Sequence, residues 1–220
     1  MAGAENIHLI SVNGLAETSV EPNMIVVQIE SWGKGASAKT AQENQATQFI
    51  KIKNLVEKYK IKKDDFKTEN YSVNPDSIWD QKTQRNKISG YRASHQISLT
   101  LREIDKAGQL IDDLTSAGKN DLTGGVSIQN TTWDTDKKAT LENSVLNDAV
   151  HNARSKAEEL AKAAGVKIKT VHRISFSSNA VAQGEVRQFS LQMASEKAQS
   201  TELSSDKIKI RVEVQMEFEI

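Results

Sequence analysis

Histidine side chains can bind metals or transfer protons when other suitable residues lie at the right spacing. The four in this chain show neither the i, i+4 spacing of H-E-x-x-H nor an H-x-H pair. His151 follows Asp148 by one turn of a predicted helix, but a metal would need further ligands from elsewhere. His95 alternates with Ile97 and Leu99 on one face of a predicted strand, which is typical of a core residue. We therefore expect no metal site and no catalytic role for any of the four, His8, His95, His151 and His172.

A glycine-rich stretch, Gly33-Lys34-Gly35-Ala36-Ser37-Ala38, matches the G-x-G-x-x-A pattern of dinucleotide-binding turns between a strand and a helix. That pattern also requires an acidic residue about 20 residues further on, at the end of the next strand. Lys53 occupies that spacing, inside a predicted helix, and the next predicted strand ends at Asn74-Pro75. The pattern therefore favours a flexible strand-to-helix turn, and a nucleotide-dependent enzyme is the weakest of three functional hypotheses.

Other catalytic patterns are missing from the sequence. There is no G-x-S-x-G nucleophile elbow, no P-loop and no cysteine. Adjacent acidic pairs have side chains that diverge, so we interpret them as solvated surface and not as acid–base dyads; they are Asp64-Asp65, Asp112-Asp113 and Glu158-Glu159. We expect a non-enzymatic protein with no catalytic, cofactor-binding or metal-binding residue and no cofactor.

Composition limits the classes of partner. Lys and Arg total 29, and Asp and Glu also total 29, so the excess of positive charge that nucleic-acid binding requires is missing. No apolar run approaches the roughly 18 residues of a membrane-spanning helix. The chain begins at Met1 without a recognisable signal peptide, which fits the mature form of an exported protein and leaves a cytoplasmic location open. Trp79, in a polar stretch, could mark a contact surface, whereas Trp32 and Trp133 are expected to cover sheet edges.

The C-terminal segment is the clearest structural signal. From Lys207 to Ile220 every even position is apolar and every odd position is polar, which predicts a strand with one buried face. Its polar face changes from three cations to three carboxylates along the chain, so two antiparallel copies would be complementary. This edge or face could join protomers, or it could face water within one chain; both alternatives are open.

The remaining patterns predict strands and helices in a defined order. Strands are expected at 7–12, 24–32, 66–73, 88–101, 126–133 and 167–177, and residues 76–87 are expected to form a loop. Helices are expected at 37–60, after an N-cap at Asp105, and at 136–164 before a C-capping Gly165. Turns at Asn13-Gly14 and at Gly33-Lys34-Gly35 are predicted to end the strands that precede them. Residues 178–206 are predicted to form a mobile excursion.

This order favours an α+β fold, with a mostly antiparallel sheet of long strands packed against two long helices and one short helix. We expect a single domain over residues 1–220, which could consist of two interlocked halves at about 7–101 and 102–220.

Several segments, in this order, resemble the SIMPL-domain family, which includes bacterial oxidative-stress-defence proteins and periplasmic immunogenic antigens. They are Val12-Asn13-Gly14, Glu21-Pro22-Asn23, residues 67–75 (KTENYSVNP), residues 88–94 (ISGYRAS), the helix Ala149–Gly165 and the alternating C-terminal strand. Asn23 departs from the pattern, where an aspartate would be expected after proline.

The resemblance implies an α+β protein of the periplasm or cell envelope that self-associates and limits oxidative damage indirectly. The family name comes from a eukaryotic member that binds a signalling kinase, so the resemblance also allows a protein-binding module. The leading hypothesis is therefore a self-associating envelope protein that forms a homo-oligomer, and the alternative is a module for a protein partner.

Overall fold

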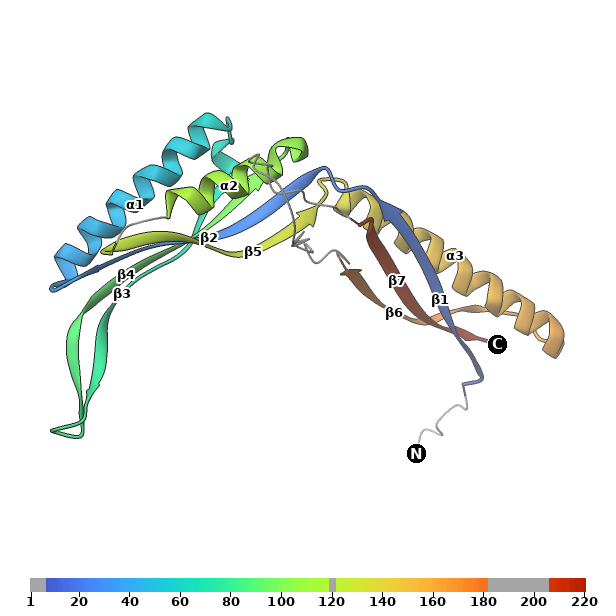
Figure 1. Ribbon diagram of the computed structural model, residues 1–220. Coiled ribbons are helices and arrows are strands. Elements are labelled where there is room, and N and C mark those ends of the chain that lie inside the picture. The colour runs from blue at the N-terminus through green and yellow to red at the C-terminus, as the bar shows by residue number, and fades with distance from the viewer. Residues whose placement is uncertain (1–6, 119–121, 182–205) are drawn as a thin grey trace, which may run out of the picture. The chain divides into compact units, whose positions relative to one another are not determined.

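The structure is a computed structural model that describes residues 7–118, 122–181 and 206–220. These residues form two compact units, each with its own antiparallel sheet. Unit 1 contains the described residues of 1–22, 135–183 and 206–220, and unit 2 those of 23–134. Figure 1 shows the helices and strands of both units. The expected α+β class and the order of helices and strands along the chain are confirmed.

Unit 1 contains a three-stranded sheet with the order β1-β7-β6. Its strands are β1 (Leu9–Val20), β6 (Thr170–Val181) and β7 (Ile208–Glu219). The predicted alternation of β7 is confirmed, since even-numbered side chains from Ile208 to Phe218 are buried and Lys209 to Gln215 are exposed at the odd positions. β7 pairs with β1 on one side and β6 on the other, so both of its edges are occupied. Association of two copies through an edge of β7 is therefore excluded. Of the two predicted alternatives, the polar face of β7 is the surface that the described residues leave exposed.

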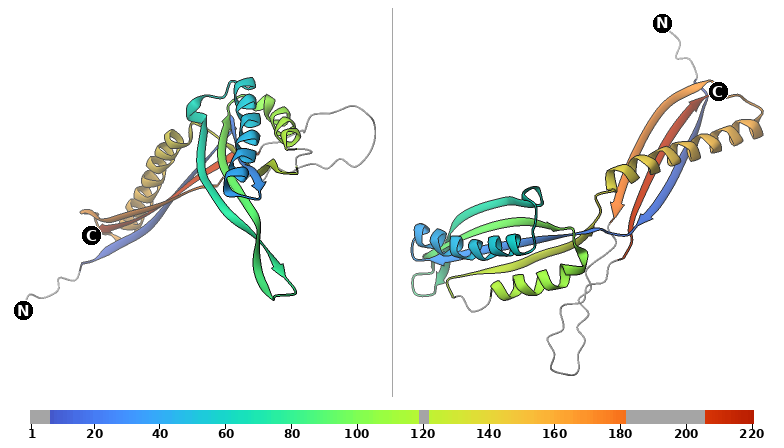
Figure 2. Two further views of the ribbon diagram at one scale, coloured as in Figure 1. Left: turned by 90° about the vertical axis from the view of Figure 1, so that its left-hand side faces the viewer. Right: turned by 90° about the horizontal axis from the view of Figure 1, so that it is seen from above.

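Helix α3 (Lys138–Ala164) lies along the apolar face of this sheet, where it packs on β1 and β7 (Figure 2). Its buried side chains recur every four residues and are small, which lets the helix approach the sheet closely; they are Val145, Ala149, Ala153, Ala157 and Ala161. Gly165 ends the helix in the left-handed conformation at φ 70°, which confirms the predicted C-cap.

Unit 2 contains a four-stranded sheet with the order β3-β4-β2-β5. Two helices cover one face of this sheet, and no helix among the described residues covers the other, here called the open face (Figure 2). The core lies between the helices and the sheet and includes Ile52, Leu110 and Leu114 from the helices and Ile25, Val27, Ile97 and Leu99 from the strands. The elements are β2 (Met24–Gly35), α1 (Ala38–Lys58), β3 (Phe66–Asp80), β4 (Arg85–Leu101), α2 (Ala107–Ala117) and β5 (Gly124–Asp134).

Two predicted turns at glycines are wrong, because these glycines allow close packing inside strands. Gly14 lies in the middle of β1, where an added Cβ would overlap the carbonyl oxygen of Ala149 on α3. Gly33 and Gly35 lie within β2, and a Cβ on Gly35 would lie 2.6 Å from the backbone nitrogen of Ala41 on α1. The turn into α1 comes after them, where Ser37 caps the helix by accepting a hydrogen bond from the Thr40 backbone N–H.

The loop predicted over residues 76–87 is confirmed only for the turn at 81–84, because β3 continues to Asp80 and β4 begins at Arg85. Pro75 does not stop β3, since this strand lies at an edge of the sheet, where a missing N–H is tolerated. Asp105 is not the N-cap of α2; it lies in a short 3-10 turn, Ile104–Lys106, and Lys106 precedes the helix without a side-chain cap. Of the excursion expected over residues 178–206, residues 178–181 belong to β6 and residues 182–205 lie outside the described residues.

No helix in the described part of the chain combines the length and the apolar character needed to cross a membrane.

Candidate functional site

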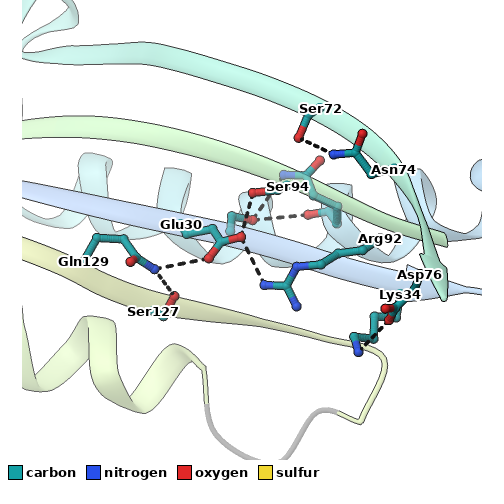
Figure 3. A network of polar contacts seen from close by, with 11 residues as sticks. Glu30, Lys34, Ser72, Asn74, Asp76, Arg92, Ser94, Ser127 and Gln129 are labelled. Carbon is teal, nitrogen blue, oxygen red and sulfur yellow. Dashed lines mark hydrogen bonds and ion pairs between the residues drawn. The ribbon is translucent and has the colours of Figure 1, made fainter. Parts of the chain in front are cut away.

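The open face of the sheet in unit 2 carries a network of polar side chains centred on Glu30 (Figure 3). One carboxylate oxygen of Glu30 accepts hydrogen bonds from Arg92 Nη2 at 3.0 Å and Ser94 Oγ at 2.6 Å. The other accepts from Gln129 Nε2 at 3.1 Å, and Gln129 also donates to Ser127 Oγ at 2.9 Å. Neighbouring strands β2, β4 and β5 position these side chains because all of them point away from the helices.

The electrostatics of this network favour a structural role. Burial raises the pKa of the Glu30 carboxyl, but the hydrogen bonds from Ser94 and Arg92 and the charge of Arg92 outweigh it, so the pKa is lowered overall. The Arg92 guanidinium also lies 4.5 Å from the centre of the Trp32 ring. A carboxylate with a lowered pKa is a weak general base at neutral pH. The network therefore holds three strands together and offers no activated proton acceptor.

One of the four histidines is buried, and the other three lie at the surface. His95 is 8% exposed and packs against Phe49 and Tyr71, with Nε2 2.9 Å from Thr68 Oγ1, which confirms it as a core residue. Burial lowers the pKa of its imidazole. The other three histidines are exposed. Within the described ranges, no three His, Asp or Glu side chains lie close enough together to hold a metal ion.

Two of the three acidic pairs contain a carboxylate held by neighbouring side chains, whereas Glu158 and Glu159 are exposed as predicted. Asp65 accepts two hydrogen bonds from Arg102, both at 2.9 Å, and these bonds lower the pKa of its carboxyl. Asp113 accepts hydrogen bonds from Lys58 and Tyr59, both at 2.6 Å, and these bonds lower the pKa of Asp113, the one from Lys58 most. These carboxylates therefore act as fixed partners of structural ion pairs, and the interpretation as solvated surface is wrong for both.

The tryptophans occupy three different environments. Trp79 is 60% exposed, as expected for a contact residue, although it lies on a strand and not in a loop. Trp32 lies on the inner strand β2 against Arg92, so it does not cover a sheet edge as predicted. Trp133 does lie on an edge strand, β5, where it is buried in the core at 4% exposure.

Beyond the last residues that β2 pairs, β3 and β4 continue as a two-stranded ribbon, here called the arm (residues 76–90; Figure 1). Its register places Trp79 and Ile88 on one face and Ile78 on the other. The three side chains are 60%, 55% and 58% exposed. An ion pair between Lys34 and Asp76, at 2.9 Å, holds the base of the arm to β2. The arm thus presents apolar side chains to solvent from a defined base.

A second apolar surface lies on unit 1, along the edge strand β6. Val171, Ile174 and Phe176 are opposite buried residues of β7 and share their face, yet they are 41%, 52% and 63% exposed. Helix α3 lies over β1 and β7, so these three side chains, here called the β6 row, extend past the helix. The sequence showed Ile174 and Phe176 on one side of a strand, but it could not show that α3 leaves them uncovered.

A groove of about 570 Å³ lies between α3 and β1, lined by Val12, Asn13, Lys156, Glu159, Leu160 and Ala163. Lys156 Nζ already donates to the Asn13 carbonyl oxygen at 2.9 Å across this groove. This hydrogen bond fastens α3 to β1.

Comparison with known proteins places the chain in a family. Residues 10–218 match the family model described as "SIMPL: Protein of unknown function (DUF541)". The chain is 27% identical over 198 residues to "Uncharacterized protein YggE" of Escherichia coli strain K12, which covers 88% of this chain and 76% of the relative. It is also 26% identical over 219 residues to the "26 kDa periplasmic immunogenic protein" of Brucella melitensis biotype 1, with 96% and 84% covered. Because the family model spans nearly all of the sequence, this chain belongs to the SIMPL family.

Proposed function

We propose that this chain is a non-enzymatic, self-associating protein of the cell envelope with an indirect role in limiting oxidative damage. The location is supported by the Brucella relative, which is named periplasmic and matches 96% of this chain. The role in oxidative stress rests on the resemblance to the SIMPL family alone.

The exposed arm is the observation that carries self-association. An isolated two-stranded ribbon is marginally stable in water, and residues 76–90 have no third strand among the described residues. Trp79 and Ile88 lie on the face that covers the core further along β3, yet at the arm neither α1 nor α2 shields them. Exposed aromatic side chains on a fixed element are typical of protein contacts. A partner surface would bury these side chains and stabilise the ribbon.

The test is the effect of the arm on assembly. We expect the double variant Trp79→Ser, Ile88→Ser to raise the concentration at which the full chain assembles by about tenfold or more. The matched control is Ile50→Ser, which removes a side chain that is 57% exposed on α1 and should leave assembly unchanged. Light scattering measures the mass, and circular dichroism checks that each variant is folded. Unchanged assembly of the folded arm variant would refute the role of the arm.

The same exposed arm also supports the alternative, a module that binds a different protein. In that case the purified chain is a stable monomer and retains a specific partner in a pull-down. The arm variant should then lose that partner, whereas the Ile50→Ser control keeps it. The mass of the purified chain separates the two functions.

Two further experiments test the remaining parts of the proposal. The purified chain should consume hydrogen peroxide no faster than buffer does, and measurable turnover would refute the non-enzymatic role. A strain that lacks the gene should be more sensitive to peroxide and should recover with the intact chain. Equal survival with and without the gene would refute the stress role.

A further inference from the structure

From its free edge and its exposed side chains, we infer that β6 pairs with β6 of a second copy in an antiparallel register centred on Ser175. Each unit 1 sheet would thereby join its partner into one continuous sheet with the order β1-β7-β6-β6-β7-β1. This inference rests on the proposed self-association and names one surface that produces it.

The two edges of the unit 1 sheet differ in whether side chains of α3 occupy their backbone groups. At the β1 edge, Asn152 of α3 accepts a hydrogen bond from the Leu15 backbone N–H at 3.2 Å, and Lys156 donates to the Asn13 carbonyl at 2.9 Å. These bonds block the edge against another strand. At the β6 edge, the described residues provide no such cover, because α3 lies over β1 and β7. Among the described residues, the sheet therefore has one protected edge, at β1, and one free edge, at β6.

The direction of the backbone groups of β6 follows from these contacts. Since Leu15 N–H and Asn13 C=O point away from β7, the even residues of β1 face it, and Gly14 lies opposite Val214. Backbone groups alternate between the two edges along an antiparallel strand, so the odd residues of β7 face β6. Ser175 lies opposite Gln215, which leaves the N–H and C=O groups of Ile174 and Phe176 directed to the free edge. The exposed apolar residues are thus also the residues available for pairing.

The sequence of β6 is complementary to itself about Ser175. In the proposed register, Ile174 of one strand lies opposite Phe176 of the other, and the pair occurs twice. Cross-strand pairs of an aromatic and a β-branched side chain are among the favourable ones. Arg173, which forms an ion pair with Glu217 at 3.7 Å, would lie opposite Ser177, so no like charges meet. Centring on Arg173 itself would bring two arginines together.

Single cysteines test the register directly, because the chain contains no cysteine and any disulfide must join two copies. Two Ser175→Cys residues would face each other at the twofold axis as a non-hydrogen-bonded pair, about 4.5 Å apart between Cα atoms. Ser177→Cys lies on the same exposed face and is the matched control, since its two copies would be four residues apart along the strands. We expect Ser175→Cys to form disulfide-linked dimers under mild oxidation, and Ser177→Cys not to form them. Linkage of both variants or of neither would overturn the inference.

A charge exchange provides a second test that needs no oxidant. The variant Ile174→Lys, Phe176→Lys places like charges opposite each other twice and should weaken β6 pairing by about tenfold or more. In Ile174→Lys, Phe176→Glu the opposed charges attract, so association should recover. Recovery of association in the Lys/Glu variant requires residue 174 of one copy to lie opposite residue 176 of the other, so it is specific to this register. Equal association of the two variants would contradict it.

These outcomes separate the inference from the proposed function. If the intact chain assembles but Ser175→Cys does not link and the charged variants assemble normally, the β6 inference fails and self-association stands. If the chain is monomeric at every concentration and no variant links, both fail. Protection of the β6 row from hydrogen exchange in such a monomer would show that the same chain covers it, which also overturns the inference.

Discussion

Replacement of Gly14 by alanine tests the packing on which unit 1 depends. The added Cβ would overlap the carbonyl oxygen of Ala149 and lie 2.7 Å from Ala153 Cβ, which is 0.7 Å inside the 3.4 Å at which ordinary contact begins. Because the first of these atoms belongs to the helix backbone, no change of rotamer relieves the overlap. Helix α3 must therefore move away from β1 along the middle of its buried face.

The energetic cost has two parts. Overpacking of a tight interior costs about 1–3 kcal/mol. Displacement of α3 also strains the hydrogen bonds from Lys156 to Asn13 and from Leu15 to Asn152, at about 1 kcal/mol each. The expected loss in the free energy of unfolding is about 3–5 kcal/mol. Ser11→Ala, on the exposed face of the same strand, is the control and should change stability by less than about 0.5 kcal/mol.

Two spectroscopic signals locate the effect. All three tryptophans, Trp32, Trp79 and Trp133, lie in unit 2, so tryptophan fluorescence reports the unfolding of that unit. Far-ultraviolet circular dichroism also reports α3. Urea unfolding of Gly14→Ala should show a larger shift in the dichroism transition than in the fluorescence transition. A variant as stable as the unmodified chain would refute the close packing of α3 on β1.

Three further predictions concern charges, a buried hydroxyl and a helix end. The carboxyls of Glu30, Asp65 and Asp113 have lowered pKa values in the folded state. The stability that they add to the folded chain is therefore complete above their ordinary pKa values, 4.5 for Glu and 3.8 for Asp, and is lost as the pH falls through the lower folded-state values. Urea unfolding followed by tryptophan fluorescence should thus show lower stability at about pH 3 than at pH 7, and equal midpoints would contradict it. Tyr59→Phe removes the hydroxyl that donates to Asp113 and should cost about 1 kcal/mol in the same assay; no loss would show that the bond is not stabilising. Gly165→Ala forces a side chain into φ 70° at a site with no neighbour within 4 Å, so a loss of about 1 kcal/mol, measured by dichroism, would be due to the backbone alone.

The sequence predicted the parts of the fold that have one buried face. The alternation of Ile208–Glu219 and the alanine repeat before Gly165 each fix which side chains are buried, and both predictions are confirmed. The arm escaped prediction because its two faces are both exposed and so leave no periodic pattern. Gly14 and Gly33 were misinterpreted as turns because a glycine needed for close approach looks the same in sequence as one needed for a bend.

The candidate surfaces were only partly visible in the sequence. Trp79 was identified as a contact residue from its polar surroundings, and its exposure is confirmed. The β6 row could not be found from sequence, since its exposure depends on where α3 lies across the sheet. The Glu30 network was missed because Arg92, Ser94 and Gln129 come together only through strand order.

The mass of the intact chain in solution, measured by light scattering over a dilution series, tests self-association most directly. We expect a species of two or more chains of 24.3 kDa that dissociates on dilution. A mass of 24.3 kDa at every concentration would contradict it.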